Sequence, residues 1–237
     1  FLDLNGLTSI TEEQAESLGN VRSSLGLDGL TQLTDTQAKE LGRISDRSYL
    51  GYKSMSLNGL TSMTNQQAAS LSNNTDTLRL NGLSAVTDEQ AESLSRVKEA
   101  LELNGLKSIT DGQAESLGRI EGYTLELNGL KSITDGQAES LSWVEERLKL
   151  NGLTSITDAQ AETLGNVAPS RYGGRSLELN GLRSITDKQA ESLSKLKYLS
   201  LEGVTSVTDA QAKSLAKIEL VSIPGDAWYL IDKYKNP

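Results

Sequence analysis

Leucines alternate with polar residues in short segments that recur along the whole chain. Each segment follows the pattern Leu-x-Leu-Asn-Gly-Leu, with small variations, and a threonine followed three residues later by a glutamine comes after it. Successive starts are 22 to 24 residues apart, except for two intervals of 30 and 29 residues. A fixed period of this length predicts a repeat protein. The nine segments begin at Leu2, Leu25, Met55, Leu78, Leu101, Leu125, Leu148, Leu177 and Leu199.

The unit that begins at Leu101 shows which elements one repeat predicts. Leu101 and Leu103 alternate with polar residues, which is the period of a short strand with one buried face. Gly105 then permits a turn or a close backbone approach. Thr110 and Gln113 match the capping box that opens a helix, and the same pair recurs in all nine units. Each unit therefore predicts a strand, a tight turn, a short helix and a return loop.

Stacking of these units is required for a stable core. One unit buries too little apolar surface to offset its ordering entropy, roughly 1–2 kcal/mol per residue. Neighbouring units together form a continuous leucine-rich core. We therefore expect an α/β solenoid with parallel strands on the concave side and short helices on the convex side.

The last residues depart from the repeat. Residues 221–223 imitate a tenth strand, but Pro224 and Gly225 replace the usual Asn-Gly turn. Asp226 is then expected to cap a helix that carries Trp228 and further apolar residues. The predicted domains are residues 1–223, a solenoid of nine repeats with a degenerate tenth strand, and residues 224–237, a C-terminal cap over the end of the core.

The consensus Leu-x-Leu-x-Gly-Leu-x-Ser-Ile-Thr-Asp-x-Gln-Ala-x-x-Leu resembles leucine-rich repeats over residues 1–223. It is similar to their cysteine-containing subclass, but the unit is shorter, and leucine or Val204 stands where that subclass has cysteine. It looks closer to the short repeats of large bacterial proteins of the planctomycete kind. The resemblance implies a horseshoe-shaped leucine-rich-repeat solenoid, a protein-interaction scaffold and no catalytic residues.

Composition and charge disfavour several classes of function. The formal net charge of −9 disfavours nucleic acid and anionic membranes as partners. The chain has no cysteine and no histidine, so it lacks thiolate ligands, imidazole ligands and the commonest general base. Glutamates recur in phase on the predicted helices, which indicates a solvated face. We expect no enzyme activity, cofactor, metal site, small-molecule substrate or membrane insertion.

Two columns of residues point outward from the predicted strands. The second column is nearly constant asparagine, which favours hydrogen bonding along the stack; a polar rail for a glycan is the alternative. The first column varies in charge and size, as a recognition surface does. Its candidate partner-binding residues are Arg79, Glu102, Glu126, Lys149 and Glu178.

The two longer intervals contain insertions that combine tyrosine, glycine and basic residues. Loops of this composition are plausible contact points with a partner. The alternative is that the tyrosines pack on neighbouring repeats. The candidate partner-binding residues in the insertions are Arg47, Tyr49, Tyr52, Arg171, Tyr172 and Arg175.

These features predict a non-catalytic protein-interaction or scaffolding module, from a longer bacterial protein that is exported or lies on the cell surface. Its partner is an unidentified protein or a second copy. One alternative is a structural component that assembles end to end or as a coat. Another is carbohydrate or ice binding by the regular asparagine and threonine rows. Because Phe1 already lies inside a predicted strand with no cap before it, we also expect the chain to be incomplete at that end.

Overall fold

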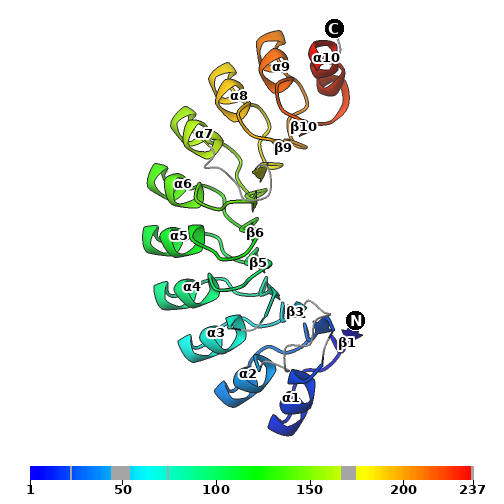
Figure 1. Ribbon diagram of the computed structural model, residues 1–237, viewed down its shortest axis with the longest axis vertical. Helices are drawn as coiled ribbons and strands as arrows, with labels where there is room; N and C mark the ends of the chain where they lie inside the picture. Colours follow the sequence, from blue (N-terminus) through cyan, green and yellow to red (C-terminus); the bar gives the residue numbers. More distant parts are fainter. Residues whose placement is uncertain (22, 44–53, 74, 167–174, 236–237) are drawn as a thin grey trace. The chain divides into compact units, whose positions relative to one another are not determined.

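A computed structural model describes residues 1–21, 23–43, 54–73, 75–166 and 175–235 of the chain. The chain forms two compact units, Phe1–Glu126 and Leu127–Pro237. In each unit short parallel strands alternate with short helices, and the helices line the side of the unit opposite the strands (Figure 1). The predicted α/β organisation is confirmed.

The first unit contains strands that pair side by side in chain order, all of them parallel. The leucine column is in register, because Leu78 pairs with Leu101 and Leu101 pairs with Leu125. The elements of this unit are β1 (Leu2–Asp3), α1 (Glu12–Gly19), β2 (Leu25–Gly26), α2 (Asp35–Leu41), β3 (Ser54–Ser56), α3 (Asn65–Ser72), β4 (Thr77–Arg79), α4 (Asp88–Leu94), β5 (Ala100–Glu102), α5 (Asp111–Gly118) and β6 (Thr124–Glu126).

The second unit repeats this arrangement. Its strands are also parallel and pair in chain order, with Leu148 beside Leu177 and Leu177 beside Leu199. The elements of this unit are α6 (Asp135–Leu141), β7 (Arg147–Lys149), α7 (Asp158–Gly165), β8 (Ser176–Glu178), α8 (Asp187–Leu193), β9 (Tyr198–Ser200), α9 (Asp209–Leu215), β10 (Leu220–Ser222) and α10 (Gly225–Lys235).

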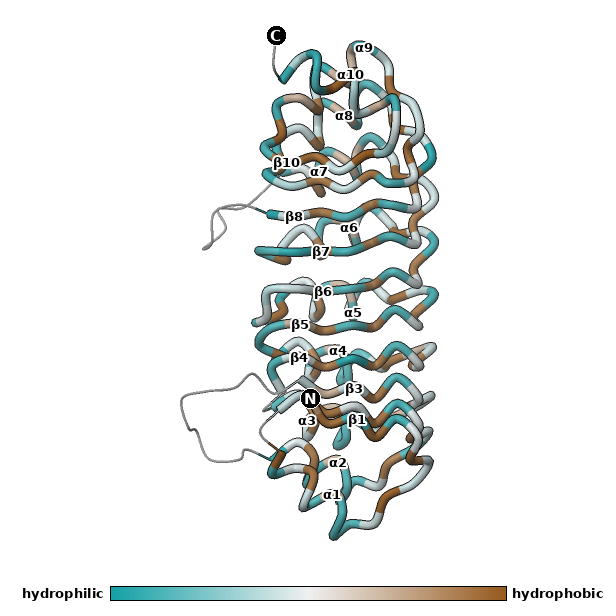
Figure 2. The backbone as a smooth tube through the Cα atoms, turned by 90° about the vertical axis from the view of Figure 1, so that its right-hand side faces the viewer, coloured by the Kyte–Doolittle hydropathy of each residue, from teal (hydrophilic) through white to brown (hydrophobic). Residues whose placement is uncertain are grey.

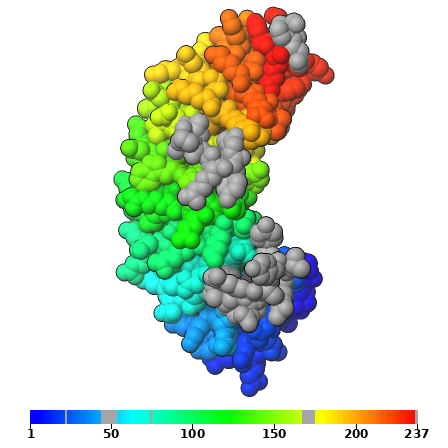
Figure 3. Space-filling model, in the orientation of Figure 1, coloured from blue at the N-terminus to red at the C-terminus, as the bar shows by residue number. Residues whose placement is uncertain are grey.

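The core of each unit is a stack of aliphatic side chains. In the repeat that starts at β5, Leu101, Leu103 and Leu106 come from the strand and turn, and Ala114 and Leu117 come from the helix; all five are fully buried. Figure 2 shows hydrophobic segments at the same place in successive turns, and Figure 3 shows that successive repeats adjoin along each unit. Because the layer between strand and helix is thin, small and branched aliphatic residues fill it and large aromatics do not fit.

The nine predicted capping boxes are all present. In each, the threonine hydroxyl accepts the backbone N–H of the glutamine, and the glutamine side-chain oxygen accepts the backbone N–H of the threonine. For Thr110 and Gln113 the two bonds measure 3.1 and 2.9 Å. These bonds satisfy helix-end groups that have no intrahelical partner.

The same side chains also join repeats to the ones before them, a contact that the capping motif alone does not predict. The Nε2 of Gln113 donates to the carbonyl oxygen of Val86 at 2.8 Å, and the hydroxyl of Thr110 donates to Asp88 at 2.9 Å. Equivalent glutamine bonds recur in both units. One motif therefore starts the helix and fixes it to its neighbour.

The C-terminal helix α10 covers the last repeat. Ile231 of α10 is fully buried, and the hydroxyl of Tyr234 donates to Asp209 at the start of α9. In earlier repeats, the threonine of the following repeat donates to this aspartate position. Asp226 was expected to precede and cap this helix. Because α10 begins at Gly225, Asp226 lies inside its first turn instead.

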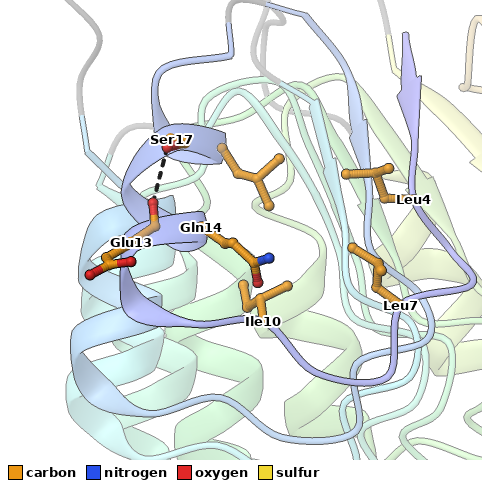
Figure 4. Close-up of a pocket in the computed structure, with 7 residues that line it drawn as sticks. Leu4, Leu7, Ile10, Glu13, Gln14 and Ser17 are labelled. Carbon is orange, nitrogen blue, oxygen red and sulfur yellow. Dashed lines mark hydrogen bonds between the residues drawn. The ribbon is translucent and has the colours of Figure 1, made fainter.

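The N-terminal face of the first repeat presents an apolar hollow of about 350 Å³ (Figure 4). Leu7 in this hollow is 39% exposed, whereas Leu30, at the same position of the next repeat, is fully buried. Gln14 caps its own helix, but no preceding carbonyl lies within reach of its amide among the described residues. The hollow is lined by Leu4, Leu7, Ile10, Glu13, Gln14, Ser17 and Leu18.

The glycine that follows the asparagine column allows a close approach of two backbones. A Cβ on Gly105 would lie 2.3 Å from the carbonyl oxygen of Leu83 and 2.4 Å from that of Asn81. Gly225 is the only glycine in the described ranges with a positive φ, so Gly105 is not needed for a left-handed conformation. The structure thus selects close approach from the two possibilities that the sequence left open.

Gly105→Ala is expected to lower the free energy of unfolding by about 1–3 kcal/mol, the usual cost of an overpacked site. Gly6 holds the same position in the first repeat, and no atom lies within 4 Å of a Cβ built there. Gly6→Ala is therefore the matched control and should change that energy by less than about 0.5 kcal/mol. Urea unfolding followed by circular dichroism measures both variants, and equal effects would contradict the close-approach argument.

Candidate functional site

The strand face of each unit, defined as the outward side of its strands, carries the two columns expected from the sequence. Because the strands are parallel and in register, equivalent side chains stand side by side at a spacing of roughly 4.8 Å. The first column contains Ser56, Arg79, Glu102 and Glu126 in the first unit and Lys149, Glu178 and Ser200 in the second.

Charged residues of the first column form ion pairs across the strands. The Nε of Arg79 lies 2.7 Å from Glu102, and its Nη1 donates to the Ser54 hydroxyl at 2.7 Å. In the second unit, the Nζ of Lys149 lies 3.8 Å from Glu178. The structure therefore brings these predicted residues together in neighbouring pairs. Their side chains stay partly exposed, so the strand face presents both signs of charge to solvent.

The second column is a ladder of hydrogen bonds between repeats. The side-chain oxygen of Asn58 accepts the backbone N–H of Asn81 at 3.0 Å, and that of Asn81 accepts the N–H of Asn104 at 2.9 Å. The second unit repeats this pattern from Asn128 to Asn180. The amides also bond sideways, as Asn81 donates to Glu102. The structural interpretation of the asparagine column is confirmed.

The last step of the ladder offers a test of its strength. The side-chain oxygen of Asn180 accepts the N–H of Glu202 at 2.9 Å and the hydroxyl of Ser200 at 2.8 Å. Asn180→Ala should lower the free energy of unfolding by about 0.5–1.5 kcal/mol for each of the two hydrogen bonds, since the Glu202 N–H and the Ser200 hydroxyl both lose their acceptor. Asn180→Asp keeps the oxygen, as Asp28 does for its neighbouring repeat, and should lose less. Thermal unfolding at pH 7 compares the two, and equal losses would contradict the role of the ladder.

The structure describes one of the six candidate contact residues in the insertions, Arg175. Five of the predicted contact residues, Arg47, Tyr49, Tyr52, Arg171 and Tyr172, lie outside the described residues and stay predictions.

Arg175, the sixth residue of this set, is buried in the second unit with an exposed fraction of 1%. Its guanidinium donates to the carbonyl oxygens of Leu141 and Ser142 at the end of α6, both at 3.1 Å. It also donates to the carbonyl of Leu164 near the end of α7, at 3.2 Å. A cation at helix C-termini is favoured by the helix dipole.

The prediction that Arg175 contacts a partner is therefore wrong for this structure, because its guanidinium is not accessible. Burial lowers the pKa of Arg175 to about 10, so the group still carries its charge at neutral pH. The carbonyls of two helix ends supply its acceptors, although its Nε has no partner among the described groups. Arg175 stabilises the repeat junction that follows the second insertion.

Arg175→Ala is expected to lower the free energy of unfolding by at least about 2 kcal/mol, because hydrogen bonds to a charged group contribute about 1.5–3 kcal/mol each. Arg183 is exposed on the same unit, and Arg183→Ala should change that energy by less than about 0.5 kcal/mol. Chemical unfolding of both variants provides the measurement. A loss of stability no larger for Arg175→Ala than for Arg183→Ala would show that the buried guanidinium is dispensable.

Side chains suited to metals or membranes do not gather in the described part of the chain. No group of three or more aspartates and glutamates lies in a metal-binding arrangement there. None of the helices in the described ranges combines the length and the apolar character needed to cross a membrane.

The comparisons with known proteins concern the fold. A leucine-rich-repeat protein from Legionella pneumophila, LegL7, is 14% identical and superposes with a TM-score of 0.63, covering 98% of this chain and 88% of that one. The fold is that of the leucine-rich-repeat proteins. The internalin InlF from Listeria monocytogenes and a chain of the yeast Rad7 and Elc1 complex are each 17% identical, with TM-scores of 0.46 and 0.48. They cover 91% and 96% of this chain, and 70% and 77% of their own. No protein-family model and no curated protein matches the sequence.

Proposed function

We propose that this leucine-rich-repeat chain is a non-catalytic protein-interaction or scaffolding module. The observation that carries the proposal is that the two columns of the strand face have different roles. The asparagine ladder holds successive repeats together, whereas the first column varies from serine to arginine, glutamate and lysine without disturbing it. A position that varies on a constant scaffold is suited to recognition of a partner.

Further support comes from the chemistry of the surface. The first column mixes both charges, as in Arg79 with Glu102 and Lys149 with Glu178, and contains few aromatic anchors. Interfaces of high affinity usually depend on buried tryptophan, tyrosine and arginine. We infer weak or multivalent contacts that extend over several repeats. The resemblance of the repeats to those of large bacterial proteins supports placement in an exported or surface protein.

A display library of random peptides tests this proposal with a defined probe. The strand-face variant replaces both partners of each ion pair by alanine. Peptides enriched on the wild-type chain should bind this variant at least about tenfold more weakly, a loss of roughly 1.4 kcal/mol in binding free energy. Biolayer interferometry of each enriched peptide gives the affinities. The variant carries Arg79→Ala, Glu102→Ala, Lys149→Ala and Glu178→Ala.

The matched control removes the same number of each charge from exposed positions in the helices and just after them. Its circular dichroism melting curve and its peptide affinities should equal those of the wild type. Peptides that bind all variants equally would contradict the strand face as the site.

A further variant tests the insertions. If this variant loses peptide binding but keeps its melting temperature, the contact lies in the insertions. The control carries Glu92→Ala, Glu115→Ala, Lys195→Ala and Lys213→Ala, and the insertion variant carries Arg47→Ala, Tyr49→Ala, Tyr52→Ala, Arg171→Ala and Tyr172→Ala.

A further inference from the structure

The strand face of the second unit carries a third set of outward residues, one at the start of each strand. The first and third residues of these strands lie on the same side of the sheet, because the middle residue is buried. The register places the four first residues side by side across the sheet. We call them the strand-start row, and in order they are Arg147, Ser176, Tyr198 and Leu220.

The strand-start row differs from the equivalent residues of the first unit. There the first residues of β3 to β6 are all small and uncharged, and none of them presents a large side chain to a partner. In the second unit, the row instead has a cation at one end and large apolar groups at the other. The equivalent residues of the first unit are Ser54, Thr77, Ala100 and Thr124.

The apolar end of the row is open to solvent at Leu220. This side chain is 59% exposed and pairs directly with Tyr198 of the neighbouring strand. A single exposed apolar residue is normal on a protein surface, but two that adjoin form a patch. The Nζ of Lys197 lies 5.2 Å from the centroid of the Tyr198 ring and 3.4 Å from Glu219. Tyr198 is therefore a fixed wall, and Leu220 supplies the open apolar surface beside it.

The basic end of the row is Arg147, which is exposed and forms no ion pair in the described part of the chain. Glu178 of the neighbouring strand already lies 3.8 Å from Lys149 and accepts from Asn151 at 3.2 Å. The insertion of this unit, residues 167–174, contains no aspartate or glutamate and cannot supply a carboxylate. The Arg147 guanidinium can therefore bind a carboxylate from another molecule.

The distance between the two ends selects the conformation of the bound segment. Three strand spacings of roughly 4.8 Å separate Arg147 from Leu220, about 14 Å in all. An extended chain rises about 3.3 Å per residue, so four residues cover about 13 Å, and residues four positions apart point to the same side. A helix covers only about 6 Å in four residues. An extended segment therefore reaches both ends of the row with side chains four positions apart.

We propose that the strand-start row binds an extended segment of a partner protein, with an aspartate or glutamate four positions away from a large apolar residue such as leucine. The carboxylate accepts hydrogen bonds from Arg147, whose planar guanidinium matches it with two parallel donors. The apolar residue packs on Leu220 beside Tyr198. This inference rests on the proposed function and names the partner chemistry for one part of the strand face.

The test titrates the intact chain, with labelled leucine methyl groups, with the peptide acetyl-Ser-Glu-Ser-Ala-Ser-Leu-Ser-amide and with its reversed sequence. The Leu220 methyl signals, assigned from Leu220→Met, should shift and saturate in NMR spectra with at least one of the two. Glutamine in place of glutamate should weaken binding at least about fivefold, because the charged hydrogen bonds are lost. The peptide acetyl-Ser-Ala-Ser-Glu-Ser-Leu-Ser-amide has the same composition but a spacing of two, and should bind at least about threefold more weakly. Leu220 signals that move with neither first peptide, or equal affinities at both spacings, would overturn the proposal.

A matched pair of arginine variants separates the row from general attraction between charges. Arg147→Gln should weaken binding of the peptide at least about fivefold. Arg183→Gln removes the same charge from an exposed position of the same unit, in the loop before α8, and should leave the affinity unchanged. Equal losses in the two variants would show non-specific attraction and overturn the site.

A second pair of variants tests the apolar end. Leu220→Ser should weaken binding at least about fivefold, whereas Leu220→Met keeps an apolar side chain and should retain it. Because Leu220 is exposed, both variants should melt like the wild type in circular dichroism. Full binding by the serine variant would overturn the proposal. Leu220 signals that shift with the concentration of the chain alone would assign the row to a second copy and also overturn it.

Failure of this inference and failure of the proposed function give different results. The strand-face variant described above leaves all four residues of the strand-start row in place. Library peptides that lose affinity on that variant, but not on Arg147→Gln or Leu220→Ser, would support the proposed function and overturn the row. Library peptides that depend on Arg147 and Leu220, but bind the strand-face variant like the wild type, would support the row and contradict the first column.

Discussion

The glutamine at the third position of each helix makes the interaction on which the rest of the structure depends. Gln113 accepts the N–H of Thr110 with its side-chain oxygen and donates to the carbonyl of Val86 in the preceding repeat with its nitrogen. The amide is almost completely buried, so either bond left unmade would cost the desolvation of a polar group. A helix of seven or eight residues is too short to be stable alone. Coupling the cap to the neighbouring repeat makes helix formation and stacking one event.

The remaining features of the repeat follow from that stacking distance. Repeats close enough for the glutamine bond bring Gly105 within van der Waals contact of two preceding carbonyls. At the same spacing, the side-chain oxygen of Asn81 reaches the N–H of Asn104. The strand, turn and helix of one repeat therefore each have a separate contact with the next, and together these contacts fix the register of the leucine core.

Several residues that depart from the consensus satisfy the same polar groups. In the first repeat, Asp3 accepts the N–H of Asn5, whereas the equivalent N–H groups of later repeats donate to a side chain of the preceding repeat. At the other end, Tyr234 donates to Asp209 in place of a threonine. After the second insertion, Arg175 binds the carbonyls at two helix ends. Residues that leave the consensus thus fall into two groups. Some form hydrogen bonds within the stack, and others, such as Trp143, have side chains that are partly exposed.

The sequence by itself determined the repeat, its elements and its caps, because these depend on residues close together in the chain. The alternation of Leu101 and Leu103 and the spacing of Thr110 and Gln113 are sufficient for a strand and a capped helix. The columns of the strand face followed from the same period. The nearly constant asparagine of the second column also indicated its structural role, since a repeated polar position in a parallel stack has equivalent groups beside it.

Only the tertiary structure decided which of the residues that depart from the repeat pattern are buried. Arg175 follows glycines and a tyrosine in an insertion, and so has the local character of an exposed loop residue. Its acceptors include carbonyls of residues 141 and 142, more than thirty positions earlier. A polar hollow between α6 and α7 likewise depends on two helices that are separated in the chain and adjacent in space. Desolvation and ion pairing are set by what surrounds a group in three dimensions, and a local pattern carries no information about surroundings that arrive from distant repeats.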